Sequence, residues 1–247
     1  MEIDSYLVLA SFAALLIGMS KGGLPLVGMM SVPVLSLVMS PVKAAVLLLP
    51  LYVISDMVGI WLYRRNYSLI NLKILAPAGV VGVMVGWLTA SMISDLTIKF
   101  IIGLVGVSFC LQTWFKRSQS EMPATASVPK GSFWGVLAGF TSFIAHAGGP
   151  PFQVFVLPQK LPKAEFAGTA TILFAIINFA KIGPYQALSP YSMDDLMKAG
   201  VLVPFALVGT ILGAYLTKRI ADVWFYRLVQ TGLFLVSLKL MSDAIFH

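Results

Sequence analysis

The sequence predicts an all-α, polytopic membrane protein made of two inverted-topology repeats, and three observations support this prediction. Hydrophobic residues occupy 58% of the 247 positions and charged residues 11%, whereas about one quarter of an ordinary soluble domain is charged. The mean hydropathy is +0.90, and the apolar residues form blocks close to the ~20 residues that cross a bilayer. Features of the first half also recur in the second. Because a water-soluble fold could not bury this much apolar surface, we expect nearly the whole chain to lie in the lipid bilayer.

A repeat relates residues 1–115 to residues 131–247. At an offset of 127, Pro77, Gly82, Gly86 and Asp95 recur as Pro204, Gly209, Gly213 and Asp222. Earlier in each half, the segment SKGGLP at 20–25 aligns with HAGGPP at 146–151, at an offset of 126. The longest polar stretch, residues 116–130, contains serine and proline and is predicted to be a cytoplasmic linker between the halves. The chain is therefore predicted to be a duplication of one transmembrane unit.

Each half is predicted to contain a short apolar block, a Gly-Gly motif, a second short block and three long blocks. Long blocks such as residues 42–63, 69–92, 98–115 and 196–216 are expected to be transmembrane helices. Before the first motif, residues 6–19 would cover about 21 Å as a helix, against a hydrocarbon core of about 30 Å. After the second motif, residues 152–157 are flanked by prolines, which oppose a continuous spanning helix. A re-entrant hairpin with the glycines near its tip fits each half better than two short crossing helices.

The placement of lysine and arginine predicts the orientation. With an odd number of crossings per half, one side of the membrane receives eleven of these residues and the other four, whereas an even number divides them eight to seven. The first division is a positive-inside signal, so we expect inverted repeats in a bacterial inner membrane with both termini periplasmic. Five full crossings per half have the same parity, so both models of the short segments stay open. The net charge of +7 follows from this topology, and no nucleic-acid partner is expected.

The two Gly-Gly motifs are the predicted substrate site. Non-helical backbone is tolerated at membrane depth only where protein buries it or water lines it, and inverted-repeat transporters place such segments around a midplane site. Glycine lets a ligand approach the main chain, and the free N–H groups at a helix start favour an anion. The alternative is that these glycines only permit close helix packing. Their repetition beside polar residues and prolines favours the site.

Three charged residues lie inside apolar segments, where an ionised side chain costs at least about 2.5 to 3.5 kcal/mol. Lys21 adjoins the first motif and is expected to neutralise an anion, unless a fully crossing helix carries it to the interface. Lys181 shares a predicted helical face with Asn178 and Tyr185. Asp56 is predicted either to pair with one of these lysines or to carry protons for coupled transport.

Polar neighbours complete the predicted site. His146, beside the second motif, could donate to an oxyanion, titrate near neutral pH or serve as a structural histidine. Because His146, His247 and Cys110 are the whole supply of histidine and cysteine, no metal centre or other cofactor is expected. The predicted substrate-binding residues are Ser20, Lys21, Gly22, Gly23, Ser142, His146, Gly148, Gly149, Gln153, Thr169, Asn178 and Lys181.

The segments GMSKGG at 18–23, TSFIAHAGGPP at 141–151 and NFAK at 178–181, together with Asp56, resemble the sulfite exporter TauE/SafE family. The resemblance runs over nearly the whole chain. It implies a membrane transporter of sulfur-containing anions such as sulfite, sulfoacetate or related organosulfonates, usually directed outward across the bacterial inner membrane. Sulfite is the lead substrate, since a compact oxyanion also suits two N–H-bearing helix starts and one or two lysines.

Two other functions are weighed against export. A passive anion channel would carry the same ion but would not respond to a proton gradient. A membrane-embedded enzyme acting on lipid or isoprenoid groups would be expected to show clustered carboxylates or a base-paired nucleophile. The sequence contains no such cluster, so we expect a transporter and not an enzyme.

Overall fold

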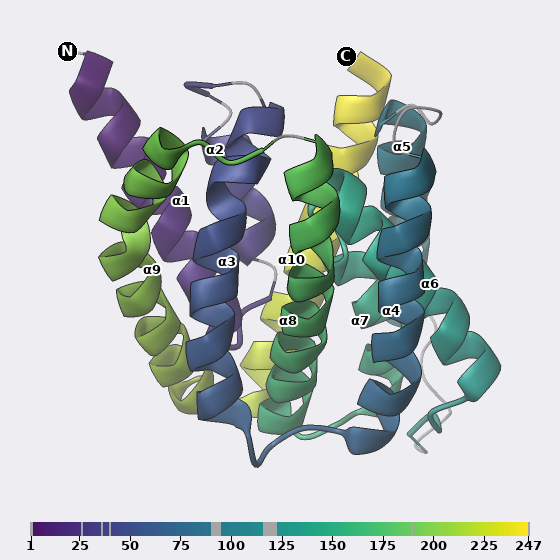
Figure 1. Ribbon diagram of the computed structural model, residues 1–247. Helices are drawn as coiled ribbons and strands as arrows, with labels where there is room; N and C mark the ends of the chain where they lie inside the picture. The colour runs from purple at the N-terminus through teal and green to yellow at the C-terminus, as the bar shows by residue number, and fades with distance from the viewer. Residues whose placement is uncertain are drawn as a thin grey trace.

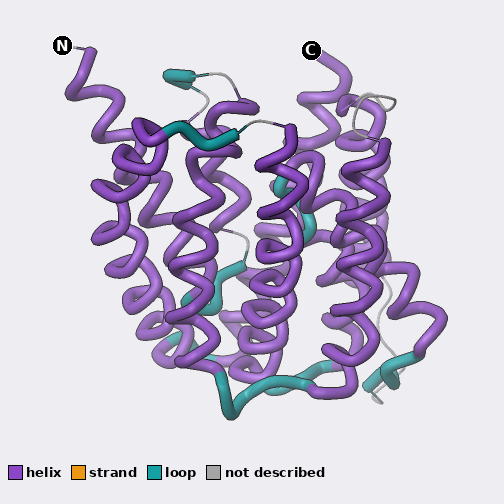
Figure 2. Tube along the Cα trace, viewed as in Figure 1, coloured by secondary structure: helices purple, strands orange, loops and turns teal. Residues whose placement is uncertain are grey.

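The computed structural model describes residues 2–25, 27–35, 37–39, 41–89, 95–115, 123–188 and 190–246. Within these ranges all regular structure is helical (Figures 1 and 2). The first half contains α1 (Glu2–Lys21), the 3-10 helix η1 (Val27–Met30), α2 (Ser31–Leu35), α3 (Pro41–Tyr63), α4 (Leu69–Thr89) and α5 (Asp95–Phe115). The second half contains α6 (Val128–Ala145), α7 (Gly149–Val156), the 3-10 helix η2 (Leu157–Gln159), α8 (Lys163–Leu188), α9 (Met193–Arg219) and α10 (Asp222–Phe246). Of the predicted linker, residues 116–122 lie outside the described ranges and residues 128–130 already belong to α6.

Among the described residues, five helices are long and apolar enough to cross a membrane, namely α3, α4, α8, α9 and α10. Their apolar spans are 21 to 27 residues long, which at about 1.5 Å per residue reaches 30 Å or more. The prediction of an all-helical, multi-pass membrane protein is therefore confirmed. Helix α1 is longer than the apolar block from which it was predicted. It has 20 residues, because the polar residues on both sides of the block continue the helix.

The chain reverses at both Gly-Gly motifs. Helix α1 ends at Lys21, and the chain then folds back so that η1 and α2 pack against α1. Gly23 has φ +112°, a conformation that glycine adopts without strain. Helix α6 ends at Ala145, and α7, which starts three residues after His146, packs back against α6. His146 is the left-handed cap of α6, and its N–H donates to the Ser142 carbonyl oxygen.

The pairing of helices is symmetric with respect to the predicted repeat. Helix α1 packs along α9, while α6, the counterpart of α1, packs along α4, the counterpart of α9. Helices α3 and α8 pack against each other, as do α5 and α10, so each of these contacts its own counterpart. The α1–α9 contact is close, because a Cβ added at Gly18 or Gly209 would overlap backbone atoms of the facing helix. Thus α1 and α6, which lead into the two Gly-Gly motifs, each pack along a helix from the other part of the chain.

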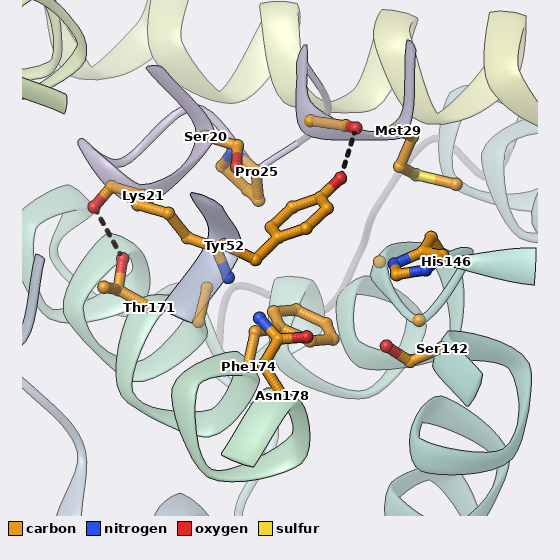
Figure 3. A pocket seen from close by; sticks show the side chains of 14 residues that line it. Ser20, Lys21, Pro25, Met29, Tyr52, Ser142, His146, Thr171, Phe174 and Asn178 are labelled. Atoms are coloured by element: carbon orange, nitrogen blue, oxygen red, sulfur yellow. Dashed lines mark hydrogen bonds between the residues drawn. The ribbon is translucent and has the colours of Figure 1, made fainter. Parts of the chain in front are cut away.

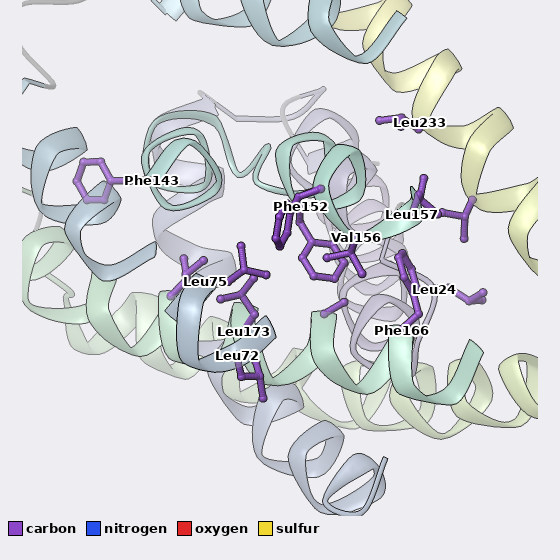
Figure 4. Close-up of a cluster of buried hydrophobic side chains, with 14 of the residues drawn as sticks. Leu24, Leu72, Leu75, Phe143, Phe152, Val156, Leu157, Phe166, Leu173 and Leu233 are labelled. Carbon is purple, nitrogen blue, oxygen red and sulfur yellow. The ribbon is translucent and has the colours of Figure 1, made fainter. Parts of the chain in front are cut away.

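Helix α7 is enclosed by the protein. Phe152 and Val156 on α7 are fully buried and belong to one hydrophobic cluster with Phe166 and Leu173 of α8 (Figure 4). This cluster also includes residues of α4, α5 and α10. Because protein surrounds it on these sides, a short helix that begins with two prolines can persist among membrane-spanning helices.

The two ends of the helix bundle differ in what they carry. The chain termini lie together at one end (Figure 1). The connections from α3 to α4, from η2 to α8 and from α9 to α10 lie at the opposite end. Exposed basic residues at this opposite end are Arg64, Arg65, Lys73, Lys160, Lys218, Arg219 and Arg227.

Candidate functional site

Four buried polar side chains form a chain of contacts between α1, α3 and α8. Lys21 Nζ lies 2.8 Å from Asp56 Oδ1. Asn178 Nδ2 donates to Asp56 Oδ2 at 2.8 Å, and Lys181 Nζ donates to Asn178 Oδ1 at 3.4 Å. The carboxylate therefore contacts one lysine directly and reaches the second through an amide.

This chain of contacts joins two lysines to a single carboxylate, that of Asp56. Lys21 is 4% exposed, and Asp56 and Lys181 are 0% exposed. With all three groups in their ordinary ionisation states, two cations face one carboxylate. Taking ions out of water is costly unless a partner compensates each charge. Asp56 is that partner for Lys21. The Lys181 side-chain nitrogen instead donates a hydrogen bond to an uncharged group, the amide oxygen of Asn178. An anion bound nearby would complete the neutralisation.

Helical spacing places the groups on α3 and α8 away from the helix ends, whereas Lys21 is the last residue of α1. Tyr52 is the central residue of α3, and Asp56 follows it by one turn on the same face. Asn178 and Lys181 lie one turn apart on α8, and Tyr185 one turn further, so the predicted polar face is confirmed. Tyr52 and Asn178 are 126 residues apart, the offset of the two Gly-Gly motifs. The two halves thus place corresponding positions at one site.

A cavity of about 50 Å³ lies beside this chain of contacts (Figure 3). Its walls come from α1, the segment after Lys21, α3, the α6–α7 turn and α8. The lining residues are Ser20, Lys21, Pro25, Gly28, Met29, Tyr52, Ser142, His146, Gly148, Gly149, Ala170, Thr171, Phe174 and Asn178. At roughly 10 to 15 Å³ per water, the cavity has room for a few waters or for an anion of similar size.

Aromatic rings surround the Lys21 ammonium. Its Nζ atom lies 5.2 Å from the Tyr52 ring centroid and 5.8 Å from that of Phe174, distances typical of cation–π contacts. The Tyr52 ring also stacks on His146, with centroids 5.4 Å apart and planes at 12°. Tyr185 is fixed by a 2.8 Å bond from its hydroxyl to the Phe143 carbonyl oxygen, and its hydroxyl lies 3.1 Å from His146 Nε2. These contacts hold both Lys21 and His146 at the cavity.

The start of α7 meets the cavity through Gly148 and Gly149. The next two residues are Pro150 and Pro151, which have no N–H, so this helix start offers fewer donors than an ordinary one. Gln153, one turn further, is fully buried, and neither of its amide atoms has a hydrogen-bond partner in the described part of the chain. Its Nε2 lies 3.5 Å from the position of a Cβ built on Gly149. This amide can supply donors that the prolines lack.

Most of the predicted site residues come together, and some lie elsewhere. Ser20, Lys21, Ser142, His146, Gly148, Gly149 and Asn178 line the cavity, and Asp56 and Lys181 contact these residues. Gly22 and Gly23 do not line it. A Cβ at Gly22 would overlap backbone of α9, and one at Gly23 would overlap the Tyr63 hydroxyl. Thr169 accepts from the Ser68 N–H at 2.8 Å, and neither residue lines the cavity.

The cavity is also lined by residues that were not predicted, among them Tyr52, Met29, Pro25 and Phe174. Tyr52 could have been found, because it lies one turn before Asp56 and at the repeat offset from Asn178. Phe174 could have been found as the residue one turn before Asn178 on the polar face of α8. Met29 and Pro25 are brought in by the fold of the segment after α1, which periodicity does not predict.

A multi-pass helical protein with a small polar cavity between its helices has the architecture expected of a membrane transporter. The comparison with protein families specifies the class further. The family model for the sulfite exporter TauE/SafE matches residues 8–240, so the chain belongs to this family, as its motifs predicted. The family is one of membrane transporters of sulfur-containing anions. Comparisons with curated proteins and with solved structures gave no match.

Proposed function

We propose that this protein exports a small sulfur-containing oxyanion, sulfite first among the candidates, across the bacterial inner membrane. The anion binds in the cavity beside Lys21 and Asn178. The observation that carries this proposal is the buried group of two lysines and one carboxylate next to a cavity of about 50 Å³. Sulfite has four heavy atoms and matches the cavity in size. Sulfoacetate and related organosulfonates are larger and would require the walls to move.

The neutral groups of the cavity suit an oxyanion. Ser142 and His146 can donate hydrogen bonds, and the start of α7 adds the N–H of Gly149 with the positive end of the helix. Gln153 does not line the cavity, but its unpartnered amide lies behind Gly149, with Nε2 3.5 Å from a Cβ built on that glycine. The Met29 and Phe174 side chains provide an apolar wall that lowers the local dielectric and strengthens these contacts. The arrangement gives an anion both charge and directional donors.

The packing of helices from each half against helices of the other half supports alternating access. Because α1 pairs with α9 and α6 with α4, each hairpin is attached to the opposite half, and the site lies where the two sets meet. In an inverted repeat, the two hairpins would enter from opposite faces and their tips would approach the midplane. Rocking of one set against the other would expose the cavity first to one side and then to the other.

Asp56 is proposed to act as the counter-charge that holds Lys21 in place before the anion arrives. The 2.8 Å contact between them supports this role over that of an isolated proton carrier. In this scheme the anion shares Lys21 with Asp56. Transport by the Asp56→Asn variant distinguishes the two roles: a proton carrier would lose only the response to a pH gradient, whereas the counter-charge would also lose exchange of anion for anion.

Flux of labelled sulfite in proteoliposomes tests the site. Lys21→Gln and, separately, Lys181→Gln are expected to lower flux at least tenfold, because each removes a buried cation near the anion. Lys198→Gln is the matched control. Lys198 is exposed and pairs with Asp194 near the start of α9, at the end of the bundle that carries the chain termini. Unchanged flux in both site variants would refute the proposal.

Two further measurements are needed, one to identify the substrate and one to distinguish coupled from passive transport. Thermal unfolding of the purified protein with sulfite, sulfate, thiosulfate, sulfoacetate, taurine or simple carboxylates ranks the ligands, since a bound anion at 100 times its Kd stabilises by about 2.7 kcal/mol. In vesicles with an imposed pH gradient, a coupled exporter moves sulfite against its own electrochemical gradient. A passive channel does not.

A further inference from the structure

The connection between α9 and α10 gathers exposed cations at the end of the bundle opposite the termini (Figure 1). Lys218 and Arg219 end α9, and Arg227 lies in the second turn of α10; all three are exposed. Asp222, which begins α10, lies 3.1 Å from Lys163 Nζ, so its charge is already compensated. None of the ion pairs found in the described ranges involves Lys218, Arg219 or Arg227. This connection with the adjoining helix ends, here called the α9–α10 corner, therefore presents three cations to its surroundings: Lys218, Arg219 and Arg227.

Two of these cations lie on exposed aromatic rings. The Arg219 guanidinium is 5.2 Å from the centroid of Tyr215, and that of Arg227 is 5.2 Å from the centroid of Trp224. The rings are 53% and 63% exposed, respectively. Tyrosine and tryptophan concentrate where hydrocarbon meets the lipid headgroups. A guanidinium that lies on a ring keeps its in-plane N–H groups available for a phosphate.

Exposed apolar faces continue from this corner toward the other end of the bundle. On α9 these include Val208, Ile211 and Leu212, and on α10 Leu228 and Leu235. Helix α9 packs mainly on α1 and α3, and α10 on α5, so the two helices do not cover each other's apolar faces. A ligand that binds here must therefore present an anionic head at the corner and apolar chains above it.

We propose that the α9–α10 corner binds an anionic phospholipid, with its phosphate at Arg219 and Arg227 and its acyl chains along α9 and α10. Free phosphate would leave the adjoining apolar faces without a partner, which is why we choose a lipid. The other end of the bundle differs, because Lys198 and Lys239 pair with Asp194 and Asp243 one turn away. The site is therefore expected in the leaflet on the basic side.

Lipid binding to the full-length protein, measured by native mass spectrometry, tests the proposal. Phosphatidylglycerol is expected to bind more tightly than phosphatidylcholine. The double variant Arg219→Gln/Arg227→Gln is expected to bind phosphatidylglycerol about 30-fold more weakly at low salt, as two basic residues at an anionic surface imply. Trp224→Leu keeps the cation but removes the ring, and should weaken binding several-fold. Raising the salt concentration should weaken the wild-type protein's preference.

Lys198→Gln/Lys239→Gln is the matched control, since it removes the same number of cations from the opposite end. It is expected to leave phosphatidylglycerol binding unchanged. Equal binding of the two lipids, equal binding by the wild type and the arginine variant, or an equal loss in both double variants would overturn the proposal. Displacement of phosphatidylglycerol by millimolar inorganic phosphate would also overturn it in favour of a free anion. Thermal unfolding of each variant in detergent verifies that these exposed substitutions leave the protein folded.

Discussion

Asp56→Asn removes the one carboxylate that faces two buried lysines, and we expect it to lower the free energy of unfolding by about 3 to 5 kcal/mol. Asparagine has the size of aspartate, and its carbonyl oxygen can still accept the hydrogen bond from Asn178 Nδ2. The loss therefore arises from charge and not from packing. It is large because Asp56 and Lys181 are fully buried and Lys21 is only 4% exposed, so bulk water does not solvate the lysines as it does in the unfolded chain.

The same charges predict the outcome of a double-mutant cycle. Lys21→Met alone should also destabilise, because it removes the direct partner of Asp56. Combined with Asp56→Asn, it should cost less than the sum of the two single losses, with an interaction energy of about 2 to 3 kcal/mol. The double variant should not regain full stability, since Lys181 stays buried without a carboxylate. Adding Lys181→Met should recover most of the remaining loss.

Unfolding by SDS titration in mixed micelles measures each variant. Lys198 and Asp194 provide the control cycle, because both side chains of this ion pair are at least half exposed. Its interaction energy should be only about 0.3 to 0.5 kcal/mol. If the losses from Lys21→Met and Asp56→Asn add to within about 0.5 kcal/mol, Lys21 and Asp56 are not coupled and the electrostatic account of the site is wrong.

Three further substitutions test other parts of the site and fold. Gln153→Met should leave stability unchanged or raise it, because an unpartnered buried amide is removed. The same substitution should weaken sulfite binding about tenfold in a thermal-shift titration. Unchanged affinity would show that the amide does not contact the anion. Tyr52→Phe keeps the ring beside Lys21 and His146 and should retain flux, at a cost of about 1 kcal/mol for the bond to the Gly28 carbonyl oxygen, whereas Tyr52→Ala should lose flux. Gly209→Ala places a methyl group against the α1 backbone and should destabilise by about 1 to 3 kcal/mol. Gly200→Ala, at a position with open space on the same helix, should instead be neutral or stabilise by up to about 1 kcal/mol; equal effects at the two glycines would contradict the close α1–α9 contact.

Helical periodicity predicted the polar face of α8 well. Asn178, Lys181 and Tyr185 are separated by one turn each, and any helix with this sequence places them on one side. The same rule, applied to α3, places Tyr52 one turn before Asp56, but an isolated tyrosine in an apolar block is also an ordinary packing residue, so periodicity alone does not assign it to the site. Its contacts with Lys21 and His146 depend on three helices at once.

The Gly-Gly motifs show where a pattern in sequence is ambiguous. Gly148 and Gly149 line the cavity as predicted, whereas Gly22 packs against α9, and its carbonyl oxygen accepts hydrogen bonds from Tyr63 and Thr217. Both motifs occupy corresponding places in the repeat. The difference arises because α7 begins at Gly149, within the second motif, while a turn and a 3-10 helix follow the first. Sequence alone does not distinguish a glycine that admits a ligand from one that admits a helix.

The sequence by itself determined the class of this protein, its helical segments and the family to which it belongs. These depend on the amount and spacing of apolar residues and on short motifs, which are local properties of the chain. Only the tertiary structure decided that Asp56 pairs with Lys21 and meets Lys181 through Asn178, and that Gln153 is left without a partner. The contacts of Asp56 with Lys21 and with Asn178 join residues more than 30 positions apart, and their geometry is set by how the helices pack. Helix packing depends on the summed fit of many side chains, so no single segment of the sequence encodes it.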